Sequence, residues 1–151
     1  MDQCAIHALI RDIRAGELDK VRATLVANPD WISTPLLTVD DQIRTATHVA
    51  ADAGQNDIVR LLLRLSPAIV REVSDDLDWS PMDLAVSKGH LDIVRILVDA
   101  GAHVGDDSVY WTPAAIAAVY GHAAVLEYLL SVGDRAHHLA LTEAARCGYV
   151  D

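Results

Sequence analysis

The sequence predicts an all-α fold, a solenoid of stacked helix-turn-helix units. Three observations predict it: glycines recur at similar intervals along the 151 residues, a Thr or Ser stands nine residues before three of them, and an apolar helical pattern follows. The recurring glycines are Gly16, Gly54, Gly89, Gly121 and Gly148, with spacings of 38, 35, 32 and 27 residues. Self-similarity at a period of about 20–50 residues is typical of repeat architectures, in which neighbouring units stack to bury a shared core.

The first helix of each unit is expected to be short and to begin after a capping hydroxyl. Ser80 and Thr112 precede Pro81 and Pro113, and Thr45 holds the corresponding place one unit earlier. A hydroxyl caps free main-chain N–H groups, and proline at the first helical position loses no hydrogen bond. The glycine that follows is expected to end the helix, because glycine adopts the left-handed conformation at low cost.

The second helix of each unit is predicted from apolar residues spaced i, i+3 and i+4. Ile93, Ile96 and Leu97 show this spacing in one unit, and Val125, Tyr128 and Leu129 show it in the next. Such a stripe is expected to pack against the first helix and against neighbouring units.

The two ends of the chain depart from this pattern. The unit from Asp2 to about Ala27 lacks the Thr-Pro start, and its polar residues are expected to be solvated, as in a capping unit. These residues are Gln3, Arg11, Asp12 and Arg14. Ala140–Cys147 reads as the first helix of a half-present fifth unit, so the chain is either part of a longer array or closed by a lone helix.

These residues resemble the ankyrin repeat family. The family pattern Thr-Pro-Leu-His-x-Ala-Ala is matched by residues 45–51, 80–86 and 112–118, and its Gly-His-x-x-Ile-Val-x-x-Leu-Leu pattern by residues 89–98. The sequence Gly101-Ala102-His103-Val104 is similar to the family's repeat ending. The resemblance implies one ankyrin repeat domain over 1–151, with a capping repeat at 1–37, repeats at 38–73, 74–103 and 104–135, and a partial repeat at 136–151.

The inter-repeat segments depart from the family. Its usual hairpin glycine, two residues before the Thr, is replaced by Ile43, Asp78 and Tyr110, so we expect short or distorted hairpins. The junction from Gly133 to His138 is too short for any hairpin.

The amino-acid composition excludes several classes of function. A hydrophobic fraction of 52% excludes a disordered acidic tail, and the net charge of −10 argues against binding to nucleic-acid phosphates or anionic membranes. No apolar stretch approaches the roughly 20 residues that span a bilayer, and no secretory signal precedes the first unit. We therefore expect a cytoplasmic monomer.

No pattern of a catalytic, metal or cofactor site is present. His48, His90 and His122 occupy framework positions of the resembled family, where hydrogen bonding across the repeat is expected. Zinc-ligand spacing, the phosphate loop and the nucleophile elbow are all missing from the sequence. Cys4 and Cys147 fall on first helices four units apart, too distant for a disulfide. We expect no enzyme activity and no cofactor.

Acidic residues gather in the segments before three of the repeats. Residues 38–44, 74–80 and 104–110 hold seven Asp, including Asp40 and Asp41, against the single base Arg44, which is −6 of the net −10. The resemblance places the residue before each Thr or Ser, and the two before each glycine, on the concave binding side. The candidate partner-binding residues are Arg44, Asp52, Asp75, Asp76, Asp78, Trp79, Ser87, Lys88, Asp106, Asp107, Tyr110, Trp111 and Tyr120.

This combination predicts a surface for a protein with a basic or basic–apolar patch, because aromatic side chains anchor interfaces and complementary charge steers encounter. Two alternatives stay open. One is an inhibitor or immunity-type protein that masks a basic enzyme such as a nuclease. The other is a structural spacer within a longer ankyrin repeat protein.

Overall fold

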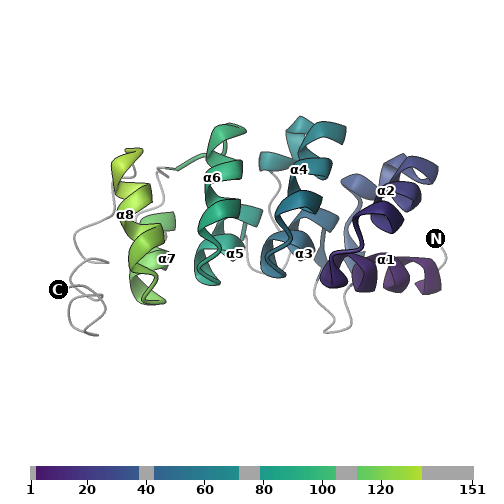
Figure 1. Cartoon of the computed structure of the whole chain (residues 1–151), viewed down its shortest axis with the longest axis horizontal. Helices are drawn as coiled ribbons and strands as arrows, with labels where there is room; N and C mark the ends of the chain where they lie inside the picture. The colour runs from purple at the N-terminus through teal and green to yellow at the C-terminus, as the bar shows by residue number, and fades with distance from the viewer. Residues whose placement is uncertain (1–2, 38–42, 72–78, 105–111, 134–151) are drawn as a thin grey trace. The chain divides into compact units, whose positions relative to one another are not determined.

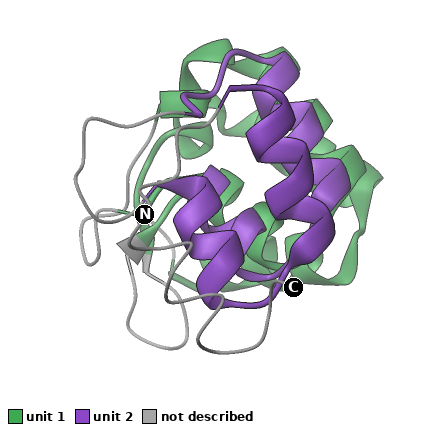
Figure 2. Ribbon diagram, turned by 90° about the vertical axis from the view of Figure 1, so that its left-hand side faces the viewer, with its two compact units in different colours: residues 1–81 green, residues 82–151 purple. Residues whose placement is uncertain are grey.

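The computed structural model describes residues 3–37, 43–71, 79–104 and 112–133. Within these ranges the chain forms eight α-helices, two 3-10 helices and one pair of two-residue strands (Figure 1). The predicted all-α class is confirmed. The chain divides into two compact units, residues 1–81 and 82–151, drawn in separate colours in Figure 2.

Unit 1 contains two helix pairs. Its elements are α1 (Gln3–Ala15), α2 (Leu18–Ala27), η1 (Pro29–Ile32), β1 (Leu36–Leu37), β2 (Ile43–Arg44), α3 (Ala46–Asp52), α4 (Asn56–Leu65) and η2 (Pro67–Arg71). α1 contacts both α2 and α3, while α4 contacts α2 and α3. Leu9, Ile13, Leu25, Ile58 and Leu62 are buried in this unit. The predicted stacking of one pair on the next is therefore present here.

The predicted ends of the first helices are confirmed. α3 begins directly after Thr45, and Gly16 and Gly54 follow the first helices of unit 1 with φ of 75° and 74°. An L-residue rarely adopts this left-handed conformation, which explains why glycine stands there.

The first inter-repeat segment forms a short hairpin. β1 and β2 pair antiparallel, with Leu36 opposite Arg44 and Leu37 opposite Ile43. A ladder of only two residues per strand is what the missing hairpin glycine predicted. The other two departures, at Asp78 and Tyr110, lie outside the described residues.

The segments that follow α2 and α4 contain short helices that the sequence pattern did not predict. Pro29 begins η1 after α2, and Pro67 begins η2 after α4. Each 3-10 helix packs on the α-helix that it follows, and Ile32 and Ile69 are buried. These turns extend the apolar core beyond the second helices.

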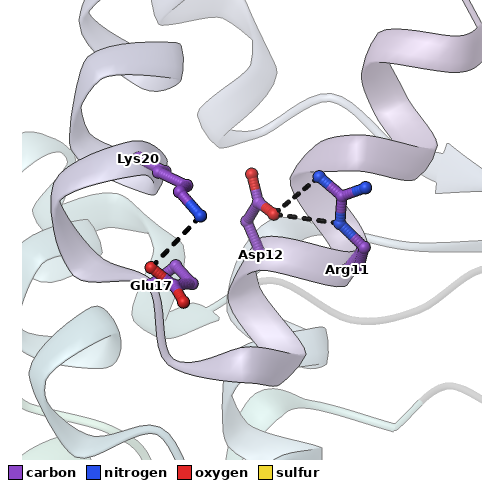
Figure 3. Close-up of polar contacts among 4 residues, drawn as sticks. All are labelled: Arg11, Asp12, Glu17 and Lys20. Atoms are coloured by element: carbon purple, nitrogen blue, oxygen red, sulfur yellow. Dashed lines mark hydrogen bonds and ion pairs between the residues drawn. The ribbon is translucent and has the colours of Figure 1, made fainter.

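One expectation for the capping unit is wrong. Asp12 was expected to be solvated, but only 9% of its surface is exposed. Its carboxylate accepts hydrogen bonds from Arg11 Nε and Nη2, at 3.1 and 3.0 Å (Figure 3). Asp12 stands four residues before Gly16, where the later units bury Ala50, Ala85 and Ala117. Charge-assisted bonding to Arg11 accounts for a carboxylate at a position that is otherwise small and apolar.

Unit 2 repeats the same arrangement. Its helices are α5 (Pro81–Ser87), which begins at the last residue of unit 1, α6 (Leu91–Asp99), α7 (Pro113–Val119) and α8 (Ala123–Ser131). α8 contacts both α7 and α6, and Ile93, Leu97, Ile116 and Leu129 are buried. Thr112 caps α7 as predicted, since its hydroxyl oxygen accepts the Ala115 N–H at 3.2 Å.

The predicted fifth unit, including Ala140–Cys147, lies outside the described residues, as does the short junction before it. Among the helices that the structure describes, none is long and apolar enough to span a membrane.

Candidate functional site

His48 connects two parts of the candidate surface in unit 1. Its side chain is fully buried on α3, and Nδ1 lies 2.8 Å from the Thr45 hydroxyl oxygen. Nδ1 also accepts the Thr45 main-chain N–H at 3.3 Å. The ring proton must then lie on Nε2, which donates to the main-chain oxygen of Trp79 at 3.0 Å. The predicted hydrogen bonding across the repeat is confirmed at this position.

The environment keeps His48 neutral at physiological pH. Burial lowers the pKa of His48 from 6.5 to about 4. This value is the net result: burial is the largest effect, the hydrogen bond to Trp79 raises the pKa, and the nearby Arg44 charge lowers it. A neutral ring is the form that the two hydrogen bonds require, because Nδ1 must keep its lone pair.

Arg44 and Asp52 form an ion pair in unit 1. Arg44 Nη1 lies 3.5 Å from Asp52 Oδ2, and the two side chains are 16% and 25% exposed. Arg44 stands before Thr45 and Asp52 is the last residue of α3, so the pair connects the two ends of this short helix. The two opposite charges largely neutralise each other, so this pair gives its part of the surface little net charge.

Trp79 is half-buried, and its main-chain oxygen is held by His48. Part of the residue is therefore accessible on an anchored backbone. An aromatic residue whose backbone is already fixed loses less entropy when a partner binds.

The described site residues of unit 2 lie at the ends of its first helices. Ser87, at the end of α5, is 8% exposed, and its hydroxyl donates to the Leu84 main-chain oxygen at 2.9 Å. Its own main-chain oxygen lies 2.9 Å from His122 Nε2, a second hydrogen bond across repeats as predicted. Ser87 therefore has a packing role in this structure.

Three neighbours of these helix ends are accessible. Tyr120 is 50% exposed and Val119 is 39% exposed, and Lys88 is also exposed. The His122–Ser87 hydrogen bond brings the chain after α7 close to the end of α5. Unit 2 thus presents apolar side chains and an ammonium group here.

The remaining predicted site residues lie outside the described residues. They are Asp75, Asp76, Asp78, Asp106, Asp107, Tyr110 and Trp111. The acidic character of the surface therefore stays a prediction from sequence. Among the side chains that the structure does describe, no group of three or more His, Cys, Asp or Glu could hold a metal ion.

The sequence of the chain matches the family model of ankyrin repeats, in three copies, over residues 9–108. It is 31% identical over 90 residues to protein phosphatase 1 regulatory subunit 27 of Mus musculus, and 30% identical to that of Homo sapiens. Each alignment covers 60% of this chain and 54% of the relative. The chain thus spans about half the length of these two relatives.

A further similarity covers a shorter segment. The chain is 46% identical over 55 residues to the probable E3 ubiquitin-protein ligase XBOS33 of Oryza sativa subsp. japonica. That alignment covers 36% of this chain and 11% of the relative.

Proposed function

Because the chain belongs to the ankyrin repeat family, we propose that it is a non-enzymatic module that binds a protein partner with a basic or basic–apolar patch. The proposed binding residues are Arg44, Asp52 and Trp79 in unit 1, and Lys88 and Tyr120 in unit 2. The acidic segments before the repeats, which include Tyr110, and the adjacent Trp111 complete the proposed set.

The anchoring of Trp79 is the observation that carries this proposal. Its main-chain oxygen accepts a hydrogen bond from the buried, neutral His48, while part of the residue remains accessible. Tryptophan is enriched among the residues that contribute most to binding, particularly where it is held in place and shielded from water. A buried histidine that fixes the backbone of an accessible tryptophan favours recognition over a purely structural role.

The charge of the partner follows from the acidic segments. Arg44 and Asp52 pair at 3.5 Å and neutralise each other, so the seven Asp residues of the segments should determine the sign of the electrostatic potential. A basic partner would be attracted from a distance of about one Debye length, roughly 8 Å at physiological salt. The exposed Tyr120 and Val119 favour an apolar contact in unit 2.

The relatives support the class of function. The mouse and human relatives are named as regulatory subunits of a phosphatase, and a regulatory subunit is a protein that acts together with another protein. The identity of the partner does not transfer to this chain, because the alignments cover about half of those proteins.

An affinity-capture experiment tests the proposal. Immobilised wild-type chain is compared with the double variant Trp79→Ala/Trp111→Ala and with Trp31→Ala, which removes a half-buried tryptophan of η1. We expect the double variant to lose proteins that wild type and Trp31→Ala retain, with a nearly unchanged Tm. We also expect the captured proteins to elute when NaCl rises to about 0.5 M, because salt screens exposed charges. Identical captured proteins for all three baits would contradict the proposal.

A further inference from the structure

A groove of about 610 Å³ opens on unit 1 beside the ends of its second helices. We name it the η1 groove, and its walls come from Pro29, Asp30 and Ile32 of η1, from residues 33–35, and from Leu65 and Ser66 at the end of α4. Its volume lies within the roughly 300–1,000 Å³ that is typical of binding pockets. None of its described lining residues belongs to the surface around Trp79.

Local hydrogen bonds hold the walls of the η1 groove in place. The Asn28 side chain donates to the Thr24 main-chain oxygen at 3.0 Å, which closes the end of α2. The Thr34 hydroxyl and main-chain N–H both donate to the Asp30 main-chain oxygen. Pro29 and Pro35 restrict the backbone on either side of these bonds. The groove therefore exists before any ligand binds, which reduces the entropy lost on binding.

The electrostatics of the η1 groove favour a cation. Asp30 is the one formally charged residue among the described lining residues, and it is exposed. α4 ends at Leu65 in the groove wall. The carboxyl end of a helix carries about half a negative charge, so the end of α4 adds to the field of Asp30. Arg64 is exposed near the end of α4 but does not line the groove.

The same groove offers an apolar contact. Leu65 is 41% exposed in the wall, whereas Ile32 is 8% exposed and contributes to the floor. Covering the exposed part of Leu65 would remove apolar surface from water, which favours association. An occupant should therefore bring an apolar side chain next to its positive charge.

We propose that the η1 groove is a second docking site, which takes an arginine or lysine with an adjacent apolar residue from an extended segment of a protein partner. The proposal rests on the proposed function only in that the occupant is a protein segment. It uses different residues, on a different part of unit 1. An acidic segment would meet Asp30 and the negative end of α4 with like charge.

A peptide titration followed by amide NMR tests this site. The probes are acetyl-Leu-Arg-Leu-amide and acetyl-Leu-Glu-Leu-amide, added separately to the full wild-type chain. We expect the arginine peptide to shift the amides of Asp30, Ile32, Ser33, Leu65 and Ser66, with at least a fivefold lower Kd than the glutamate peptide. Equal Kd values for the two peptides, shifts centred elsewhere, or no shifts at millimolar peptide would overturn the proposal.

Two pairs of variants separate charge from apolar contact. Asp30→Asn should remove the preference for the arginine peptide, whereas Asp57→Asn, which neutralises an exposed acid of α4 outside the groove, should keep it. Leu65→Ser should raise the Kd of the arginine peptide at least threefold, whereas Leu130→Ser, which changes a leucine of α8 that is 44% exposed, should not. If a control variant changed peptide binding as much as the groove variant with which it is paired, the assignment of the site would be overturned.

The Trp79 surface provides an independent check. Trp79→Ala should leave the Kd of the arginine peptide unchanged, because Trp79 does not line the groove. A weakened peptide affinity in this variant would overturn the separation of the two sites. Failure of the groove and failure of the Trp79 surface are therefore distinguishable.

Discussion

The imidazole of His48 donates from Nε2 to the main-chain oxygen of Trp79 at 3.0 Å, while its Nδ1 accepts the Thr45 N–H at 3.3 Å. One buried side chain thus caps α3 and fixes the backbone of an accessible tryptophan 31 residues later. This relationship joins the stability of unit 1 to the surface that we propose for binding.

Acidification should destabilise the chain through His48. The pKa of His48 is about 4 in the folded state against 6.5 in the unfolded chain, so the unfolded state binds a proton at higher pH. Stability is therefore fully present above pH 6.5 and is lost as pH falls toward 4. The expected loss from this group between these values is about 3 kcal/mol. Urea unfolding at pH 7 and at pH 4 measures it.

Two variants isolate this contribution from that of the carboxylates. His48→Gln should show a smaller loss of stability between pH 7 and pH 4 than wild type, by about 3 kcal/mol. His103→Gln, which changes an exposed histidine, should follow wild type. Parallel pH profiles for all three proteins would refute a neutral, buried His48.

Substitution by valine should change the stability in opposite directions at two threonines that differ in hydrogen bonding. Thr47 is fully buried, and its hydroxyl oxygen has no hydrogen-bond partner among the residues that the structure describes, so Thr47→Val should stabilise the chain by about 1 kcal/mol. Thr112 caps α7 by accepting from Ala115, so Thr112→Val should cost about 1 kcal/mol. Urea midpoints give both values, and a destabilised Thr47→Val would show that its hydroxyl is satisfied in solution.

Two glycines test the close packing across unit 2. Gly89 has φ of 74°, and a Cβ there would lie 2.6 Å from Nδ1 of His122, whose ring is held by Ser87. Gly101 has φ of 90°, with nothing within 4 Å of such a Cβ. Gly101→Ala should therefore cost about 1–2 kcal/mol for backbone strain alone. Gly89→Ala should cost about 1–3 kcal/mol more from overpacking, and equal urea midpoints would argue against the contact.

Much of the fold could be predicted from sequence because local chemistry determines it. Thr45, Pro81 and Thr112 mark the starts of first helices, and the left-handed glycines mark their ends. These signals act within a few residues of the chain. η1 and η2 could not be predicted in this way, because a proline after a helix permits several turns. The burial of Ile32 and Ile69, which favours the 3-10 turns, depends on tertiary packing.

The candidate site was predicted less completely. Position in the repeat identified Arg44 and Asp52, but it could not show that the two side chains pair with each other. Ser87 was selected by the same positional argument, although its side chain is buried. Asp12 was expected to be solvated as a polar residue of a capping unit, and neither its burial nor its bonds from Arg11 could be predicted from sequence. Side-chain partners of this kind depend on three-dimensional geometry.

The most direct test of the central claim is the Kd of a captured partner for the wild-type chain and for Trp79→Ala, measured by isothermal titration at about 0.05 and 0.2 M NaCl. The account predicts that Trp79→Ala raises the Kd at least tenfold with little change in Tm, and that wild-type binding weakens as salt rises. A Kd within twofold of wild type, with the fold intact, would contradict binding through the Trp79 surface.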